Sequence, residues 1–371
     1  MIHFVDLIKQ QKALKNDISD VIKDVISRSH FILGKEVQEL EKILSEYVGN
    51  KCISVANGTD ALLVALMAIG VKQDDEVLVP SFTWVSTAEV VCMLKAKPVF
   101  IDIDENFNID LNKIEEKITK KTKAIIPVSM FGSCPELKNI KEISDKYNLK
   151  CIEDAAQSFG AKSSGKLSCS VLDISTTSFF PAKPLGCYGD GGAIFTNDED
   201  LFERIKVIPR HGQKGRYEYH EVGINSRLDT IQAAILIEKM KIFEDEINSR
   251  IKIAKKYEKL LSDIDLIKTP YIPDEDNRSV WAQYTLILDK KISEERESLM
   301  EDLLSKGIPT ALYYPRPLHT SPVYEAFNST DLNNTNDISS RVLSLPMHPY
   351  LTDDDINLIA FELEKSIKKI L

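Results

Sequence analysis

Residues 52–70 read CISVANGTDALLVALMAIG. Cys52–Val55 is a short run with the composition of a strand, and Asp60–Ile69 is an apolar run of helical length. Asn57 and Gly58 supply a turn between the two. The stretch therefore predicts a strand that leads directly into a buried helix, which is the first half of a βαβ unit.

The same alternation of short β-branched runs and helical segments continues toward the C-terminus. The predicted strands are Glu76–Val79, Pro98–Ile103, Ala124–Val128 and Cys151–Glu153, and the predicted helices are Thr83–Leu94 and Pro135–Tyr147. This order predicts a mostly parallel, doubly wound α/β sheet covered on both faces. Because such sheets bind ligands beyond the carboxyl ends of their strands, the residues that follow the strands are the candidate site residues.

The two flanks of this region predict the domain organisation. The N-terminal flank predicts helices over Leu14–Ser29 and Glu36–Val48, and a helical pattern over Leu228–Leu261 is expected to bridge domains or to be broken once. Beyond it, strands over Val280–Leu288, Pro309–Tyr314 and Val342–Leu345, a mobile surface loop over Glu325–Asp337 and a helix over Asp353–Ile370 predict a smaller α/β domain. We therefore expect a large cofactor-binding domain over 1–245 and a small domain over 246–371.

Composition narrows the classes of function. The chain has 371 residues, of which 43% are apolar, and a net charge of −10 with acidic and basic residues interleaved, so generic nucleic-acid binding is not expected. The N-terminus lacks the pattern of a secretory signal, and the longest apolar run, Ala61–Val71, is too short to span a bilayer. The six cysteines form no CxxC pair, so reduced, buried thiols are favoured over a metal site or disulfides. A cytoplasmic protein without membrane contact is expected.

Four features after the strands have both a functional and an ordinary interpretation. Asp154 follows a buried strand and needs a cationic partner, such as a protonated pyridine nitrogen, unless it is a helix N-cap. Lys183 lies in a Pro-rich turn, where an apolar setting would favour the free amine that forms a Schiff base, although most loop lysines are solvated. Gly58 and Thr59 open a helix whose amides could hold a phosphate, or form a plain βα turn. Trp84 could stack on a planar ring or lie in the core. Together the four features match the requirements of pyridoxal 5'-phosphate (PLP).

Seven motifs resemble the DegT/StrS family of PLP-dependent nucleotide-sugar aminotransferases, and the resemblance covers nearly the whole chain. The motifs are Phe31–Gly34, Ala56–Leu62, Pro80–Trp84, Glu153–Ser158, Ser178–Gly192, Gly223–Asp229 and Ser344–Pro349. The resemblance implies the PLP-dependent transferase type I (aspartate aminotransferase-like) fold.

The resemblance also implies roles for individual residues. Lys183 would bind PLP covalently and act as the catalytic base, and Asp154 would pair with the pyridine nitrogen. The remaining cofactor contacts would be Gln157 to the ring hydroxyl, Gly58, Thr59 and Ser178 to the phosphate, and Trp84 stacked on the ring. Asn225 would reach the phosphate of a neighbouring subunit, which implies a homodimer with shared active sites.

The implied reaction moves an amino group from L-glutamate, which leaves as 2-oxoglutarate, to a keto-sugar linked to a nucleotide diphosphate, with pyridoxamine 5'-phosphate as the aminated cofactor. The family makes amino sugars for lipopolysaccharide and other cell-surface polysaccharides. Residues 178–192 and 210–213 most resemble the branch that aminates UDP-2-acetamido-2-deoxy-3-oxo-glucuronate, but Tyr313 stands where that branch tends to have histidine. Candidate substrate-binding residues are Phe31, Arg210, His211, Arg227, Tyr313, Tyr314 and Arg316.

Three alternatives remain from the sequence. A 4-keto-sugar aminotransferase of the same family differs only in pocket shape, which a pattern does not resolve. A PLP-dependent sugar dehydratase would carry histidine where Lys183 stands. A non-catalytic regulator with this fold is not indicated, because Lys183 and Asp154 are both present.

Overall fold

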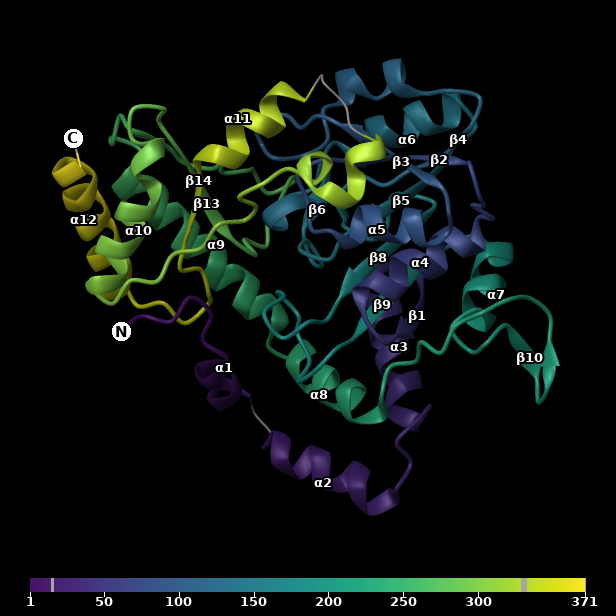
Figure 1. The fold of residues 1–371 in the computed structure, drawn as a ribbon. Helices are drawn as coiled ribbons and strands as arrows, with labels where there is room; N and C mark the ends of the chain where they lie inside the picture. The colour runs from purple at the N-terminus through teal and green to yellow at the C-terminus, as the bar shows by residue number, and fades with distance from the viewer. Residues whose placement is uncertain (15–16, 328–331, 371) are drawn as a thin grey trace.

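A seven-stranded sheet forms the centre of the computed structural model, which describes residues 1–14, 17–327 and 332–370 (Figure 1). Its strand order is β1-β9-β8-β5-β4-β2-β3. The neighbours from β8 to β3 are parallel, and β9 alone runs antiparallel to both β1 and β8. The prediction of a mostly parallel sheet is confirmed. The bounds are β1 Lys51–Val55, β2 Glu76–Pro80, β3 Lys97–Ile101, β4 Thr122–Ile125, β5 Lys150–Asp154, β8 Ile174–Ser178 and β9 Gly192–Thr196.

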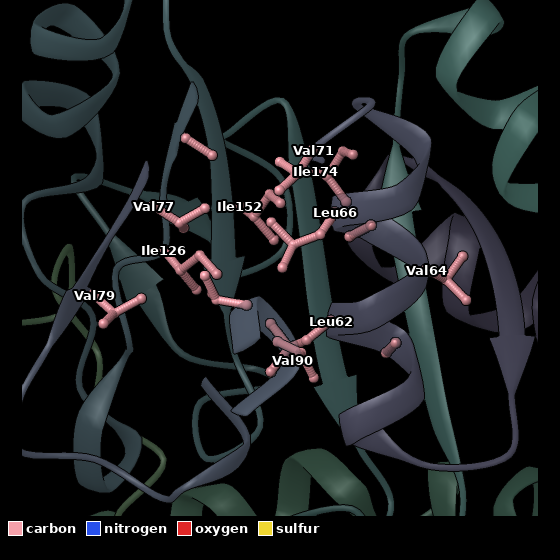
Figure 2. Packing of buried hydrophobic residues seen from close by; sticks show 14 of the residues in the cluster. Leu62, Val64, Leu66, Val71, Val77, Val79, Val90, Ile126, Ile152 and Ile174 are labelled. Carbon is pink, nitrogen blue, oxygen red and sulfur yellow. The ribbon is translucent and has the colours of Figure 1, made fainter. Parts of the chain in front are cut away.

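Helices cover both faces of this sheet because successive strand residues point to opposite faces. On one face Ile53, Val77 and Ile152 pack with α4 (Gly58–Ala68), α5 (Ser86–Met93) and α7 (Glu199–Val207), the core drawn in Figure 2. On the other face Cys52 packs with α3 (Lys35–Val48) and α8 (Thr230–Met240), and Leu78 packs with α6 (Leu137–Lys146). The doubly wound arrangement thus follows from strands that bury side chains on both faces.

The C-terminal part has a sheet and an apolar core of its own. The antiparallel strands β12 (Ile267–Lys268), β13 (Tyr284–Leu288) and β14 (Val342–Leu345) pack with α9 (Phe243–Leu261), α10 (Arg296–Ser305) and α12 (Asp353–Ile370). The long predicted helix is broken once, between α8 and α9, as expected. The predicted domain boundary between residues 245 and 246 falls inside α9 and stays a prediction.

Smaller elements complete the described chain. Two hairpins are formed by β6 (Lys162–Ser163) with β7 (Lys166–Leu167) and by β10 (Gln213–Gly215) with β11 (Glu218–Tyr219), and the second projects from the body in Figure 1. Short 3-10 helices occupy Leu111–Lys113, Glu115–Lys117, Met130–Gly132, Ser293–Glu295, Leu318–Thr320 and Pro322–Phe327. Within the described residues no helix is long and apolar enough to cross a bilayer.

The predicted helix over Leu14–Ser29 corresponds to α2 (Ile18–Arg28), and α1 (Leu7–Ala13) precedes the predicted range. Each helix is begun by an aspartate, Asp6 for α1 or Asp17 for α2, whose side chain accepts a hydrogen bond from a first-turn amide. Two other local predictions were wrong. The Pro309–Tyr314 segment is not a strand, and only Ala311 forms a bridge, to Ser344. Within the predicted loop Glu325–Asp337, residues 328–331 lie outside the described residues, and residues 333–337 begin α11 (Asn333–Arg341).

Distant side-chain capping explains why α11 forms despite its polar sequence. The carboxylate of Asp102 accepts hydrogen bonds from the backbone N–H of Asn334 (3.0 Å) and of Thr335 (2.7 Å) and from the Thr335 hydroxyl (2.6 Å). Free amides at a helix start need such an acceptor. The cap comes from the end of β3, so the local sequence does not reveal it.

Candidate active site

Asp154 is the last residue of β5 and lies among parallel strand ends, where ligands of such sheets bind. Its side chain is buried, and burial raises its pKa. One carboxylate oxygen accepts a hydrogen bond from the Thr87 hydroxyl (2.8 Å) and the other from the Ala156 N–H (3.2 Å). Residues 156–160 form turns, so Asp154 is not the N-cap of a following helix. The alternative interpretation of Asp154 as a helix N-cap is therefore wrong.

Lys183 lies in a closed loop between β8 and β9. The loop is joined at its base by a hydrogen bond from Cys187 N–H to Phe179 C=O (2.8 Å), and Lys183 N–H donates to Phe180 C=O (2.9 Å). Burial lowers the pKa of Lys183, and the charge of Asp154 acts in the opposite direction. The lysine is thus a partly buried amine that feels the charge of Asp154, rather than a fully solvated loop residue.

The start of α4 forms a narrow cradle against the end of β8. A Cβ atom added at Gly58 would lie 2.7 Å from the Cβ of Ser178, so only glycine fits at this position. The Thr59 hydroxyl lies 2.7 Å from the Ser86 hydroxyl of α5, while Asn57 caps the helix by accepting from Asp60 N–H (2.8 Å). Helix-terminal amides beside three hydroxyls suit a phosphate group. Capping and phosphate binding are therefore compatible here.

Two aromatic rings and an amide are linked to one another near Asp154. Gln157 accepts a hydrogen bond from Phe131 N–H (2.8 Å) and donates one to the Tyr314 hydroxyl (3.2 Å). The Tyr314 ring centroid lies 6.2 Å from that of Trp84, and 58% of Trp84 is exposed, so Trp84 is not a core residue. Burial, with the nearby charge of Asp154, raises the pKa of Tyr314. The arrangement of Trp84, Tyr314 and Gln157 near Asp154 fits a flat heteroaromatic ring.

Five other predicted residues gather in a second group, which we call the Asn225 segment, beside the start of α4. Arg210 and Asn225 form an isolated antiparallel β-bridge through their backbones, and His211 N–H donates to Ile224 C=O (3.0 Å). Arg227 donates to the Asn225 side chain (2.6 Å), and Phe31 C=O accepts from Thr230 N–H (2.9 Å). The segment is tied to the cofactor side by Ser226, whose hydroxyl accepts from Ala56 N–H (3.1 Å).

Two donor groups of the Asn225 segment, one exposed and one buried, are suited to bind an anion. The Asn225 side chain is exposed, and the buried Nε of Arg227 has no hydrogen-bond partner in the part of the chain that the structure describes. Lys214 and Arg216 lie on the exposed β10–β11 hairpin, and Arg316 is exposed after the Tyr313–Tyr314 pair. The roles predicted for Asn225, Arg227 and Arg316 stay predictions.

Sequence reasoning missed Thr87 and Ser86. Both lie on α5, where the sequence shows a serine and a threonine within an apolar helix, and such residues are common without a functional role. Their position one turn after Trp84 was the available signal, because residues near a helix start face the same sheet edge as the residue that precedes it.

Comparison with known proteins gives matches over the full site. A model of the DegT/DnrJ/EryC1/StrS aminotransferase family matches residues 12–364. A UDP-2-acetamido-2-deoxy-3-oxo-D-glucuronate aminotransferase from Pseudomonas aeruginosa is 50% identical over 98% of this chain and 99% of its own length. The matched region includes both groups of site residues.

Solved structures agree with the observed fold. An aminotransferase of this family from Brucella abortus superposes with a TM-score of 0.92 at 41% identity, covering 98% of this chain and 99% of the other. NtdA from Bacillus subtilis, solved with its bound cofactor PMP, gives a TM-score of 0.89 at 30% identity and covers 98% and 83%. The central sheet and the small C-terminal part both fall within the superposed region.

Proposed function

Because the chain belongs to the DegT/DnrJ/EryC1/StrS aminotransferase family, we propose that it transfers an amino group from L-glutamate to a UDP-linked 3-keto sugar. The observation that carries the proposal is a partly buried lysine with a lowered pKa near a buried aspartate at the sheet edge. The relative from P. aeruginosa supports a 2-acetamido-3-oxo-glucuronate as the sugar. Synthesis of a cell-surface polysaccharide in the cytoplasm is part of the same proposal.

The residues present fit PLP, which would supply an electron sink for proton removal at the carbon next to the amine. Gly58, Thr59 and Ser178, with the newly found Ser86, would hold the phosphate. Asp154 would hold a proton on the pyridine nitrogen, and Thr87 fixes the orientation of its carboxylate. Burial lowers the pKa of Lys183, which favours the uncharged amine that can attack a carbonyl and accept a proton.

A second subunit would complete the site. Asn225 and Arg227 carry exposed or unpartnered donor groups at one edge of the Asn225 segment, which suits a phosphate or a sugar carboxylate supplied from outside this chain's own cofactor cradle. We include the homodimer with shared sites in the proposal on this ground. The presence of Lys183 argues against the dehydratase alternative.

The test is the visible absorbance spectrum of the purified protein with PLP, before and after L-glutamate, for wild type and Lys183→Ala. We expect a Schiff-base band in wild type that is replaced by a pyridoxamine band with glutamate, and no such band in the variant. A wild-type spectrum that glutamate does not change would contradict the proposal. NMR of products from 3-keto and 4-keto UDP-sugars would then decide the position of amination.

A further inference from the structure

Lys239 is a buried lysine on α8, behind the loop that bears Lys183. Only 2% of it is exposed. Its Nζ donates a hydrogen bond to the Gly186 carbonyl oxygen (2.6 Å) and lies 4.4 Å from the centre of the Tyr188 ring. Burying an ammonium group against a carbonyl and an aromatic face is costly compared with an apolar side chain. The two contacts offset part of this cost, and a lysine at such a position points to a specific role in holding the loop.

Lys239 holds the Gly186 end of the closed loop that carries Lys183. The Cys187 N–H and thiol both donate to Phe179 C=O (2.8 and 3.1 Å), which joins the two ends of the loop. A Cβ atom added at Gly186 would lie 2.5 Å from the Pro181 carbonyl oxygen, so the two sides of the loop are in direct contact. A displacement of Gly186 would therefore displace Pro181, two residues before Lys183.

Helix α8 fixes this loop at a second point. Gln232 accepts a hydrogen bond from Tyr188 N–H (2.9 Å) and donates one to Tyr188 C=O (3.2 Å). Gln232 and Lys239 are seven residues apart, about two helical turns, so both face the loop from the same side of α8. The backbone of Gly186 and Tyr188 is thus held by three side-chain hydrogen bonds from one rigid helix.

We propose that Lys239 is a positioning residue that fixes the loop of Lys183 on α8, so that the Lys183 amine meets the PLP carbonyl carbon in the correct orientation. This inference rests on the proposed role of Lys183 as the PLP-binding lysine. Lys239 does not contact the reacting atoms. It acts through the Gly186 carbonyl, and its charge strengthens that hydrogen bond.

The first test is the dissociation constant for PLP, measured by absorbance titration. Lys239→Met keeps the length of the side chain but removes the donor, and we expect affinity to fall about tenfold, the typical effect of losing a hydrogen bond to a charged group. Lys239→Arg keeps the donor and the charge and should restore most of the affinity. Lys241→Met is the matched control, because Lys241 lies at the end of α8, is exposed on its solvent side and pairs with Glu238 rather than with the loop, and it should bind PLP as wild type does.

The second test is the pH dependence of PLP affinity, compared between wild type and Lys239→Arg. It does not depend on whether Lys239→Met folds. Burial lowers the pKa of Lys239 to about 8, while Glu246 on α9 and Cys187 in the loop act to raise it. Tyr188 and Cys187, the other titratable groups beside it, have raised pKa values. Lys239 should therefore lose its charge as pH rises through 8, and the PLP affinity of wild type should fall with it. Arginine stays charged over this range, so the PLP affinity of Lys239→Arg should not show this fall.

The outcomes separate the two proposals. If wild type forms no Schiff base with PLP, the proposed function fails. If wild type binds PLP through Lys183 but the Met variant binds equally well, or the Arg variant has the same pH profile as wild type, the positioning role alone is overturned.

Discussion

Burial shifts the pKa in opposite directions for Asp154 and Lys183, the two residues on which the proposed chemistry depends. It raises the pKa of Asp154 and lowers that of Lys183, so both are shifted toward the uncharged form, and the charge of each opposes the shift of the other. A cationic group next to Asp154 would restore its ionised state, whereas Lys183 needs to be uncharged to attack a carbonyl. The same low-dielectric setting therefore suits both roles.

At the residue scale, Gly58→Ala tests the phosphate cradle. The added methyl group would lie 2.7 Å from the Ser178 Cβ, so the start of α4 or the end of β8 must shift. We expect PLP affinity to fall at least about tenfold, because loss of even one good phosphate hydrogen bond has that effect. Equilibrium dialysis of PLP would measure it.

Thr59→Ser serves as the control for this substitution, because it keeps the hydroxyl that lies next to Ser86 and adds no atoms. Its affinity should stay close to that of wild type. An unchanged PLP affinity in Gly58→Ala would show that the cradle does not hold the phosphate.

Elements differ in how far their own sequence specifies them. The strands β1 and β2 and the helix α12 were predicted within one or two residues, because each has a complete apolar pattern of its own. Residues 309–314 were not predicted correctly, because a strand needs pairing along its length and only Ala311 pairs, with Ser344. Residues 333–337 were not predicted correctly either, because α11 begins at the distant carboxylate of Asp102. Such requirements are not visible in a local window.

The dependence of α11 on Asp102 gives an element-scale prediction. Asp102→Ala leaves the amides of Asn334 and Thr335 without their acceptor. We expect the free energy of unfolding to fall by about 1–2 kcal/mol, the usual cost of losing an N-cap, and amide hydrogen exchange to rise first in α11. Urea denaturation and exchange mass spectrometry would measure the two effects.

Asp110→Ala is a suitable comparison, because Asp110 caps only the short 3-10 helix Leu111–Lys113. It should leave exchange in α11 unchanged. Exchange in α11 that does not respond to Asp102→Ala would mean that the helix is held by packing rather than by its cap.

At the scale of the whole molecule, the proposed shared site concerns the Asn225 segment. It lies beside the start of α4 through the Ser226 contact, its Asn225 amide is exposed, and the buried Arg227 Nε has no hydrogen-bond partner within the described chain. In a two-fold dimer each such segment would face the equivalent surface of the other copy. The active site would then depend on two chains.

Subunit mixing tests this dependence. Lys183→Ala and Asn225→Asp should each be inactive alone, the second because a carboxylate next to a phosphate is repulsive. After the two are unfolded and refolded together, heterodimers would contain one site with neither substitution, so activity should return to about a quarter of the wild-type level for random pairing in a two-fold dimer. Transaminase assays on the mixture would measure it.

No recovery of activity in the refolded mixture, with heterodimers demonstrated by differently tagged chains, would show that each chain builds its own complete site. Mixing without unfolding is the control. It should give no activity if subunits do not exchange during the assay.

The sequence by itself determined the sheet, the helices on both its faces and the motifs that bear Lys183, Asp154, Gln157 and Gly58, because apolar periodicity and turn residues act within a few positions of one another. Only the tertiary structure decided what surrounds them: Thr87 on the Asp154 carboxylate, Ser86 beside Thr59, Tyr314 on Gln157 and Lys239 behind the Lys183 loop. These contacts join residues from separate elements. Burial and pKa shifts depend on such neighbours, and the folded chain is what brings them together.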